Sequence, residues 1–144
     1  MKKLHFTAIA VLFIVFAASC GNNTSQSSTS SAPDASSAVS GVAVYNRTCI
    51  TCHQANGAGI PGTFPPLAKS DFLTDKEKVI TQIIKGYVGE LVVNGVKYNN
   101  VMPPQQLTDE EIAAVLTYIY SNFGNSGEGV SADDVKAVKA KLPG

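Results

Sequence analysis

The sequence predicts a small all-α domain of short helices that also contains one β-hairpin. Two stretches, 74–85 and 108–124, place apolar residues at helical spacing behind a residue that can cap a helix. Between them, Asn94-Gly95 joins two short apolar runs, which is the strongest short-range indication of a hairpin. The chain has 144 residues, and the first 40 are expected to lie outside any globular core, so there is room for one such domain.

Residues 1–19 are expected to be a lipoprotein signal peptide. A positive start precedes residues 6–18, which are apolar except for one threonine. As a helix this run would span about 20 Å, short of a hydrocarbon core of roughly 30 Å, so a signal segment fits better than a membrane span. Ala17-Ala18-Ser19-Cys20 resembles the bacterial lipobox, although its usual leucine is Ala17 here. We therefore expect lipidation of Cys20; the alternative is ordinary signal cleavage nearby, which leaves a spare thiol.

Residues 20–40 are expected to form a lipid-anchored flexible linker. They are rich in serine and hold little that a core could bury. Twenty such residues have a root-mean-square reach of about 25 Å. Such a tether would let the following domain, predicted over 41–124, meet partners at a membrane surface.

The stretch Cys49-Ile50-Thr51-Cys52-His53 is the attachment motif for a c-type haem. Each cysteine can add through its sulfur to one haem vinyl group, and the histidine can supply a nitrogen ligand to the iron. A structural zinc site is the first alternative, but it needs four ligands. The chain has three Cys and two His, and Cys20 and His5 fall in the signal and anchor segment. A redox dithiol is the second, and it is expected near a βαβ pattern, which this sequence lacks.

Helices and one hairpin are predicted around this motif. Residues 41–50 read as a short helix that enters it. In the helix at 74–85, Thr74 and Glu77 would form a capping box and Gly86 would end the helix. The hairpin at 91–98 should carry a type I′ turn at Asn94-Gly95. The expected apolar face of the helix at 74–85 consists of Val79, Ile80, Ile83 and Ile84.

The last predicted helix of the domain starts at Thr108, where Glu111 completes a second capping box, and Gly124 closes it. Its buried face should hold Ile112, Val115, Leu116 and Ile119. Residues 125–144 are a C-terminal extension. A short helix at 131–142 could pack on the domain, on a partner or on nothing.

Met102 is the candidate for the second iron ligand. Apart from the initiator it is the only methionine, and it lies between polar residues and Pro103-Pro104 rather than on a periodic apolar face. A thioether suits haem iron, and ligation by histidine and methionine raises the reduction potential. A lone methionine is more often a core residue, and that is the alternative.

These motifs resemble class I cytochrome c over about residues 41–124. Gly41 and Tyr45 stand where that family carries its small and aromatic helix-contact residues, and Tyr118 matches the partner aromatic on the last helix. In Phe64-Pro65-Pro66-Leu67, the resemblance implies that the Pro65 carbonyl accepts a hydrogen bond from His53. The alternative is that Pro65-Pro66 is simply a stiff loop. It further implies a cytochrome c fold with one haem c, bound through Cys49 and Cys52 and ligated by His53 and Met102.

With a protein ligand on each face of the iron, the expected function is one-electron transfer and not catalysis. By resemblance, the partners are a quinol-oxidising complex and a terminal oxidase or nitrite reductase. The alternatives are a small haem peroxidase with Met102 unbound, a haem sensor, or a haem subunit of a larger oxidase or reductase complex. Positive and negative residues number 11 each, with no basic patch, so nucleic acid is not an expected partner. We expect a monomer in the bacterial cell envelope, anchored to a membrane and facing the periplasm or another extracytoplasmic space.

Overall fold

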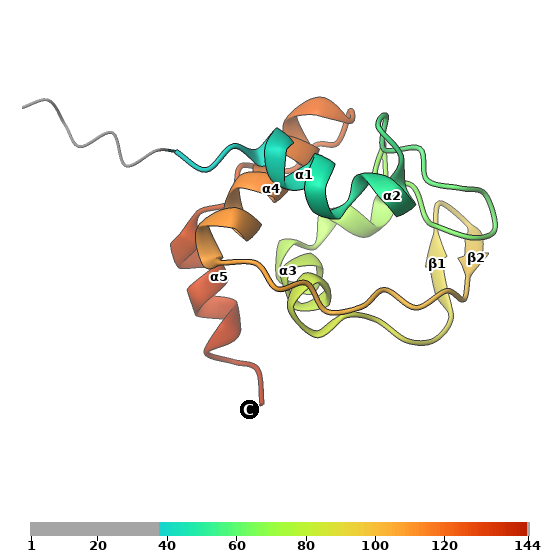
Figure 1. The fold of residues 1–144 in the computed structure, drawn as a ribbon. Helices are drawn as coiled ribbons and strands as arrows, with labels where there is room; N and C mark the ends of the chain where they lie inside the picture. The colour runs from blue at the N-terminus through green and yellow to red at the C-terminus, as the bar shows by residue number, and fades with distance from the viewer. Residues whose placement is uncertain (1–37, 144) are drawn as a thin grey trace, which may run out of the picture. The chain divides into compact units, whose positions relative to one another are not determined.

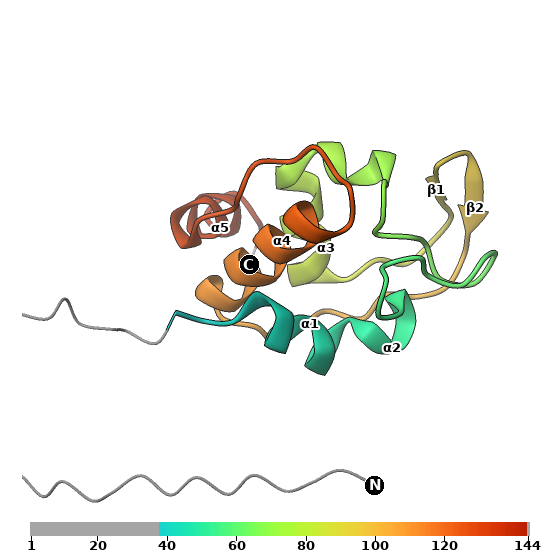
Figure 2. The same ribbon diagram turned by 90° about the horizontal axis from the view of Figure 1, so that it is seen from above.

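The computed structural model describes residues 38–143, which form short helices and one hairpin (Figure 1). The views in Figures 1 and 2 place α5 and the hairpin at opposite ends, with the other helices between them. The all-α prediction with one small hairpin is confirmed. Within the described residues, no helix is both long and apolar enough to cross a membrane. The elements in chain order are α1 (Gly41–Thr48), α2 (Ile50–His53), the 3-10 helix η1 (Asp71–Thr74), α3 (Lys76–Lys85), β1 (Leu91–Val93), β2 (Val96–Tyr98), α4 (Asp109–Asn122) and α5 (Ala132–Lys139).

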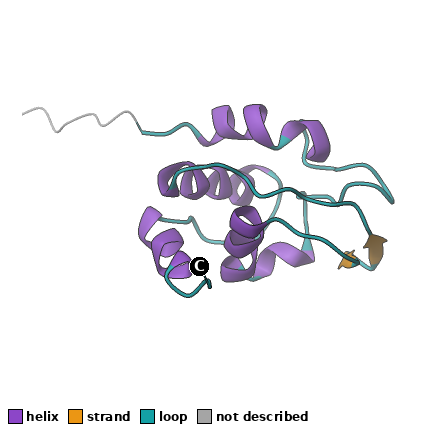
Figure 3. Cartoon of the chain, turned by 60° about the horizontal axis from the view of Figure 1, so that its bottom comes forward, coloured by secondary structure: helices purple, strands orange, loops and turns teal. Residues whose placement is uncertain are grey.

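The predicted signal peptide, Cys20 and most of the predicted linker lie outside the described residues. Figure 3 shows the helices gathered toward one end of the described part, and long loops that connect the elements around the hairpin. These loops, together with α2, α3 and α4, surround the candidate site.

Helices α1 and α4 cross at a glycine. A Cβ atom on Gly41 would lie 2.2 Å from the carbonyl oxygen of Ala114 and 2.8 Å from the Cβ of Tyr118, so only glycine permits this approach. Next to the crossing, the Tyr45 ring is fully buried, with its centroid 5.5 Å from that of Tyr118. The contacts predicted for Gly41, Tyr45 and Tyr118 are therefore present.

The start of α3 differs from the prediction by one residue. Asp75, not Thr74, is the N-cap, and its side chain accepts a hydrogen bond from the backbone N–H of Lys78. Thr74 instead ends η1, where its hydroxyl donates to the Asp71 carbonyl. Asp is at least as good an N-cap as Thr, and here the preceding 3-10 turn already engages the threonine hydroxyl. The predicted end at Gly86 is confirmed.

The hairpin and α4 follow the predictions closely. Val93 pairs with Val96, and Asn94 and Gly95 both have positive φ (51° and 78°), as a type I′ turn requires. Thr108 and Glu111 form the expected reciprocal capping box. The four residues predicted to form the buried face of α4 are each at most 3% exposed.

Helix α5 packs against α3 and α4. Val135 and Val138 are buried, and the box at its start is made by Ser131 and Asp134. Asp134 also pairs with Lys76 at the start of α3, with 3.2 Å between Nζ and Oδ1. Further ion pairs join Lys139 to Asp109 and Lys141 to Glu77. Of the outcomes left open for this extension, the structure shows packing on the domain.

The predicted helix at 41–50 is divided at Cys49, and α2 then ends at a strained residue. Gln54 has φ 65° and ψ 161°, a combination that is otherwise almost confined to glycine. The Tyr45 hydroxyl donates a 2.7 Å hydrogen bond to the Gln54 carbonyl, and Gln54 N–H donates to Ile50. These bonds hold the backbone immediately after His53 in one conformation.

We predict that Asp134 stabilises the packing of α5 in a pH-dependent way. Hydrogen bonds from Ser131 and the Lys76 ammonium favour its carboxylate and lower its pKa from 3.8 to about 2. Because the folded-state pKa is the lower one, the contribution is complete above pH 3.8 and is lost as the pH falls through about 2. Asp134→Asn should lower the free energy of unfolding at pH 7, and its difference from wild type should disappear near pH 2. The exposed Asp133→Asn is the control; an equal effect there would contradict this role.

We also predict that Gln54→Gly raises the stability of the protein. Glycine adopts the observed conformation without strain, and the gain should be roughly 1 kcal/mol after the greater freedom of the unfolded chain is subtracted. The control is Gln106→Gly at an exposed loop position without positive φ. There the glycine relieves no strain and only increases the freedom of the unfolded chain, so it should lower the stability. Denaturant unfolding of both variants measures the difference. A destabilised Gln54→Gly would show that its side chain matters more than its backbone.

Candidate functional site

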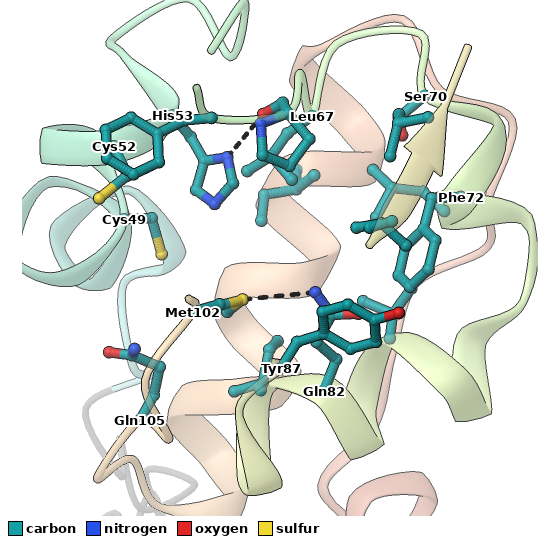
Figure 4. A pocket seen from close by; sticks show the side chains of 18 of the residues that line it. Cys49, Cys52, His53, Leu67, Ser70, Phe72, Gln82, Tyr87, Met102 and Gln105 are labelled. Atoms are coloured by element: carbon teal, nitrogen blue, oxygen red, sulfur yellow. Dashed lines mark hydrogen bonds between the residues drawn. The ribbon is translucent and has the colours of Figure 1, made fainter. Parts of the chain in front are cut away.

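One pocket of about 240 Å³ lies between α2, α3, α4, the hairpin and the segments around residues 64–67 and 98–107. None of the residues that line it is charged, and most are apolar. Figure 4 shows His53 and Met102 on opposite sides of this pocket, with Cys49 and Cys52 at one edge. The arrangement suits a flat apolar group that must be held from both faces.

Two free thiols border the pocket at the α1–α2 junction. Cys49 and Cys52 are both half-buried and are not joined in a disulfide. Burial, and secondarily the proximity of Cys52, raise the pKa of the Cys49 thiol to about 11. Helical backbone around them keeps both side chains on the pocket side, so both sulfurs are available for thioether bonds.

His53 ends α2, and its ring orientation is fixed. Its Nδ1–H donates a 2.9 Å hydrogen bond to the Pro65 carbonyl, because a carbonyl can only accept. This tautomer leaves the lone pair on Nε2 for a metal. Burial lowers the pKa of His53, and the bond to Pro65 opposes that shift. Burial thus favours the neutral ring, which is the form that can bind iron.

The Pro65 carbonyl is itself positioned by a tight loop. Ile60 and Phe64 exchange two backbone hydrogen bonds of 2.8 Å, and Gly59 N–H donates to the His53 carbonyl. A Cβ atom on Gly59 would lie 2.6 Å from the Pro65 oxygen, and its φ is 65°. Glycine is thus needed here for both space and backbone conformation. The sequence pattern alone left open whether Pro65-Pro66 was simply a stiff loop.

Met102 approaches from the other side on an extended segment. It pairs with Tyr87 through two backbone hydrogen bonds of 2.8 and 3.0 Å. The segment passes so close to the end of α3 that a Cβ atom on Gly86 would lie 2.5 Å from the Met102 carbonyl oxygen. These contacts fix the backbone of Met102, and its side chain lines the pocket.

Gln82 is the site residue that the sequence analysis missed. Its Nε2 donates to the Met102 Sδ at 3.6 Å across the pocket (Figure 4). An informative pattern was present: Gln82 lies between Val79 and Ile83 on the apolar face of α3. A polar side chain on the apolar face of a helix needs a hydrogen-bond partner within the protein.

The five predicted site residues of the described chain all line this one pocket: Cys49, Cys52, His53, Pro65 and Met102. Cys20, the predicted lipidation site, lies outside the described residues. The donor set fits haem c, because it offers two free thiols, an imidazole with a free Nε2 and a thioether around an uncharged cavity. Within residues 38–143, no group of three or more His, Cys, Asp or Glu side chains is placed so that it could hold a metal ion.

Comparisons with known proteins agree with this site. Residues 38–123 match the family profile "Cytochrome c". Cytochrome c-552 of Thermus thermophilus is 41% identical over 112 residues, covering 70% of this chain and 85% of that protein. The fructose dehydrogenase cytochrome subunit of Gluconobacter japonicus is 34% identical over 110 residues, which cover 69% of this chain and 22% of that protein. The alcohol dehydrogenase (quinone) cytochrome c subunit of Gluconobacter oxydans is 28% identical, with the same coverages.

The agreement of profile, relatives and pocket settles the family and its cofactor. The chain belongs to the class I cytochromes c, monohaem electron carriers, and its haem c is bound covalently through Cys49 and Cys52.

Proposed function

We propose that this chain is a lipid-anchored one-electron carrier whose iron is ligated by His53 and Met102. The observation that carries the proposal is the position of these two side chains, on opposite sides of one uncharged pocket that also presents both cysteines (Figure 4). No other histidine lies in the described residues, and Met102 is the only methionine there.

Haem c supplies an iron that accepts and releases one electron. The residues of this chain set the reduction potential of that iron. The hydrogen bond from His53 to Pro65 fixes the imidazole and strengthens it as a donor. A thioether opposite raises the reduction potential, and an apolar, uncharged surrounding favours the less charged ferrous state.

Ligands from both sides would leave the iron without an open position. A peroxide molecule would first have to displace Met102, whose backbone is tied to Tyr87 and packed against Gly86. Fixed ligands also mean little rearrangement when the iron changes charge. These features support a carrier over the peroxidase alternative.

The proposal extends to place and partners. Ala17-Ala18-Ser19-Cys20 and the serine-rich stretch after it support a lipid anchor and a tether on the extracytoplasmic side of a membrane. The dehydrogenase relatives are named as cytochrome subunits, which supports redox proteins as partners in general. We propose that a quinol-oxidising complex is the donor and that a terminal oxidase or nitrite reductase is the acceptor.

Met102→Ala tests the ligand assignment. It should lower the reduction potential by on the order of 0.1 V or more, because the axial ligand is a main determinant of that potential. It should also abolish the weak near-red charge-transfer band of the ferric protein and let carbon monoxide bind the ferrous protein. Absorption spectroscopy and a redox titration measure all three changes.

The control for this experiment is Gln106→Ala, an exposed neighbour that does not line the pocket. It should keep the band and the potential of the wild type. If the wild type lacks the band at neutral pH, or if Met102→Ala changes none of the three properties, Met102 is not the ligand. The peroxidase alternative would then regain support.

Cys20→Ala tests the anchor separately from the haem chemistry. We expect the wild type to sediment with membranes and Cys20→Ala to be released as a haem-containing protein, because acyl chains need that sulfur. Ser19→Ala, which leaves the cysteine in place, is the control. A Cys20→Ala protein that still fractionates with membranes would refute the lipid anchor.

A further inference from the structure

The segment that carries Met102 is attached to a single region of the described chain. Residues 99–107 form four hydrogen bonds with other segments, and all four go to residues 82–87, at the end of α3 and directly after it. The bonds join Tyr87 and Met102 twice, Gln105 to Ile83, and Gln82 to the Met102 sulfur. The position of the ligand segment therefore depends on the last turn of α3.

Helix α3 is also held by the C-terminal extension, which reaches both of its ends. Figures 1 and 2 show α3 between α5 and the hairpin. We call residues 132–143 the brace. Three polar contacts join the brace to α3: Lys76 Nζ to Asp134 Oδ1 at 3.2 Å, Lys141 Nζ to Glu77 Oε1 at 2.9 Å, and Lys85 Nζ to the Pro143 carbonyl at 2.8 Å.

Helix α3 needs such contacts because it has only 10 residues. An isolated helix of that length is marginal in water, and its stability comes mainly from packing. Its last residue, Lys85, is bound by the brace, and the next two residues, Gly86 and Tyr87, contact the Met102 backbone. The brace and the ligand segment thus meet at the same turn of the chain.

We propose that the brace is a positioning element for the iron ligand: by holding α3, it keeps Met102 on the iron against ligands that compete for that position. The proposal rests on the ligation by His53 and Met102 proposed above. When Met102 leaves the iron, its segment no longer supports the last turn of α3, and the contacts of that turn with the brace weaken. Linkage requires the converse, so a weaker brace must favour release of Met102.

The brace should hold Met102 less firmly as the salt concentration rises. The side chains of its two ion pairs to α3 are between 36% and 61% exposed. Exposed pairs contribute little individually, and dissolved ions screen them. The wild type should therefore release Met102 to a competing ligand more readily at high ionic strength than at low.

Binding of imidazole to the ferric protein measures this release. At about pH 8, where imidazole is neutral, its nitrogen replaces the Met102 sulfur on the iron, and the iron is neither oxidised nor reduced. The near-red band disappears as imidazole binds, so a titration followed by absorption gives the affinity. Denaturant unfolding of the same protein samples gives the stability of the fold separately.

Three alanine substitutions test the brace, and each removes one positive charge. Lys85→Ala and Lys141→Ala each remove a contact with the brace, whereas Lys97→Ala removes the ion pair with Glu90 and touches neither α3 nor the brace. The first two variants should each bind imidazole roughly twofold to fivefold more tightly at low salt, and their double variant more tightly still. Lys97→Ala should match the wild type. The increase in affinity that salt causes in the wild type should be much smaller in the double variant.

Three results would overturn the proposal. If Lys85→Ala and Lys141→Ala lower the free energy of unfolding but bind imidazole as the wild type does, the extension stabilises the fold without positioning the ligand. If Lys97→Ala raises the affinity equally, net charge and not the brace is responsible. A wild type without the near-red band contradicts Met102 ligation itself, and the carrier proposal fails together with the brace. A wild type that has the band while the variants have no effect contradicts the brace alone.

Discussion

The fold has to bring two side chains from separate segments, His53 and Met102, to opposite sides of one pocket and keep them there. Each is fixed through a neighbouring backbone. The Nδ1–H of His53 is bound by the Pro65 carbonyl, which a loop closed at Gly59 holds in place. Met102 is paired with Tyr87 and packed on Gly86. Because each support includes a close backbone approach that only glycine permits, the ligand positions depend strongly on the path of the chain.

The strong local patterns of the sequence were sufficient to predict most elements. The Thr108–Glu111 box, the Asn94-Gly95 turn and the apolar face of α4 each depend on residues close in sequence, and the structure has all three. The N-cap of α3 was predicted one residue early. The Thr74 hydroxyl is already hydrogen-bonded to the Asp71 carbonyl within η1, and the sequence pattern did not reveal that 3-10 helix.

The features that could not be predicted are tertiary contacts. The donation from Gln82 to the Met102 sulfur joins α3 to a distant loop. The strain at Gln54 depends on the Tyr45 hydroxyl, which reaches it from the preceding helix. Tyr45 was expected to fill the crossing of α1 and α4, and it does. Its hydroxyl also donates a hydrogen bond to the carbonyl of Gln54, the residue after His53. One side chain thus links helix packing to the ligand loop.

Charge placement and ligand placement belong to one arrangement. Ion pairs secure α5 at one end, and none of the residues that line the pocket is charged. The central claim, that a thioether from Met102 completes the ligation begun by His53, is tested most directly by X-ray absorption at the iron edge of the full-length ferric protein at neutral pH. One sulfur atom in the first coordination shell is the predicted result. A shell of nitrogen and oxygen alone would contradict it.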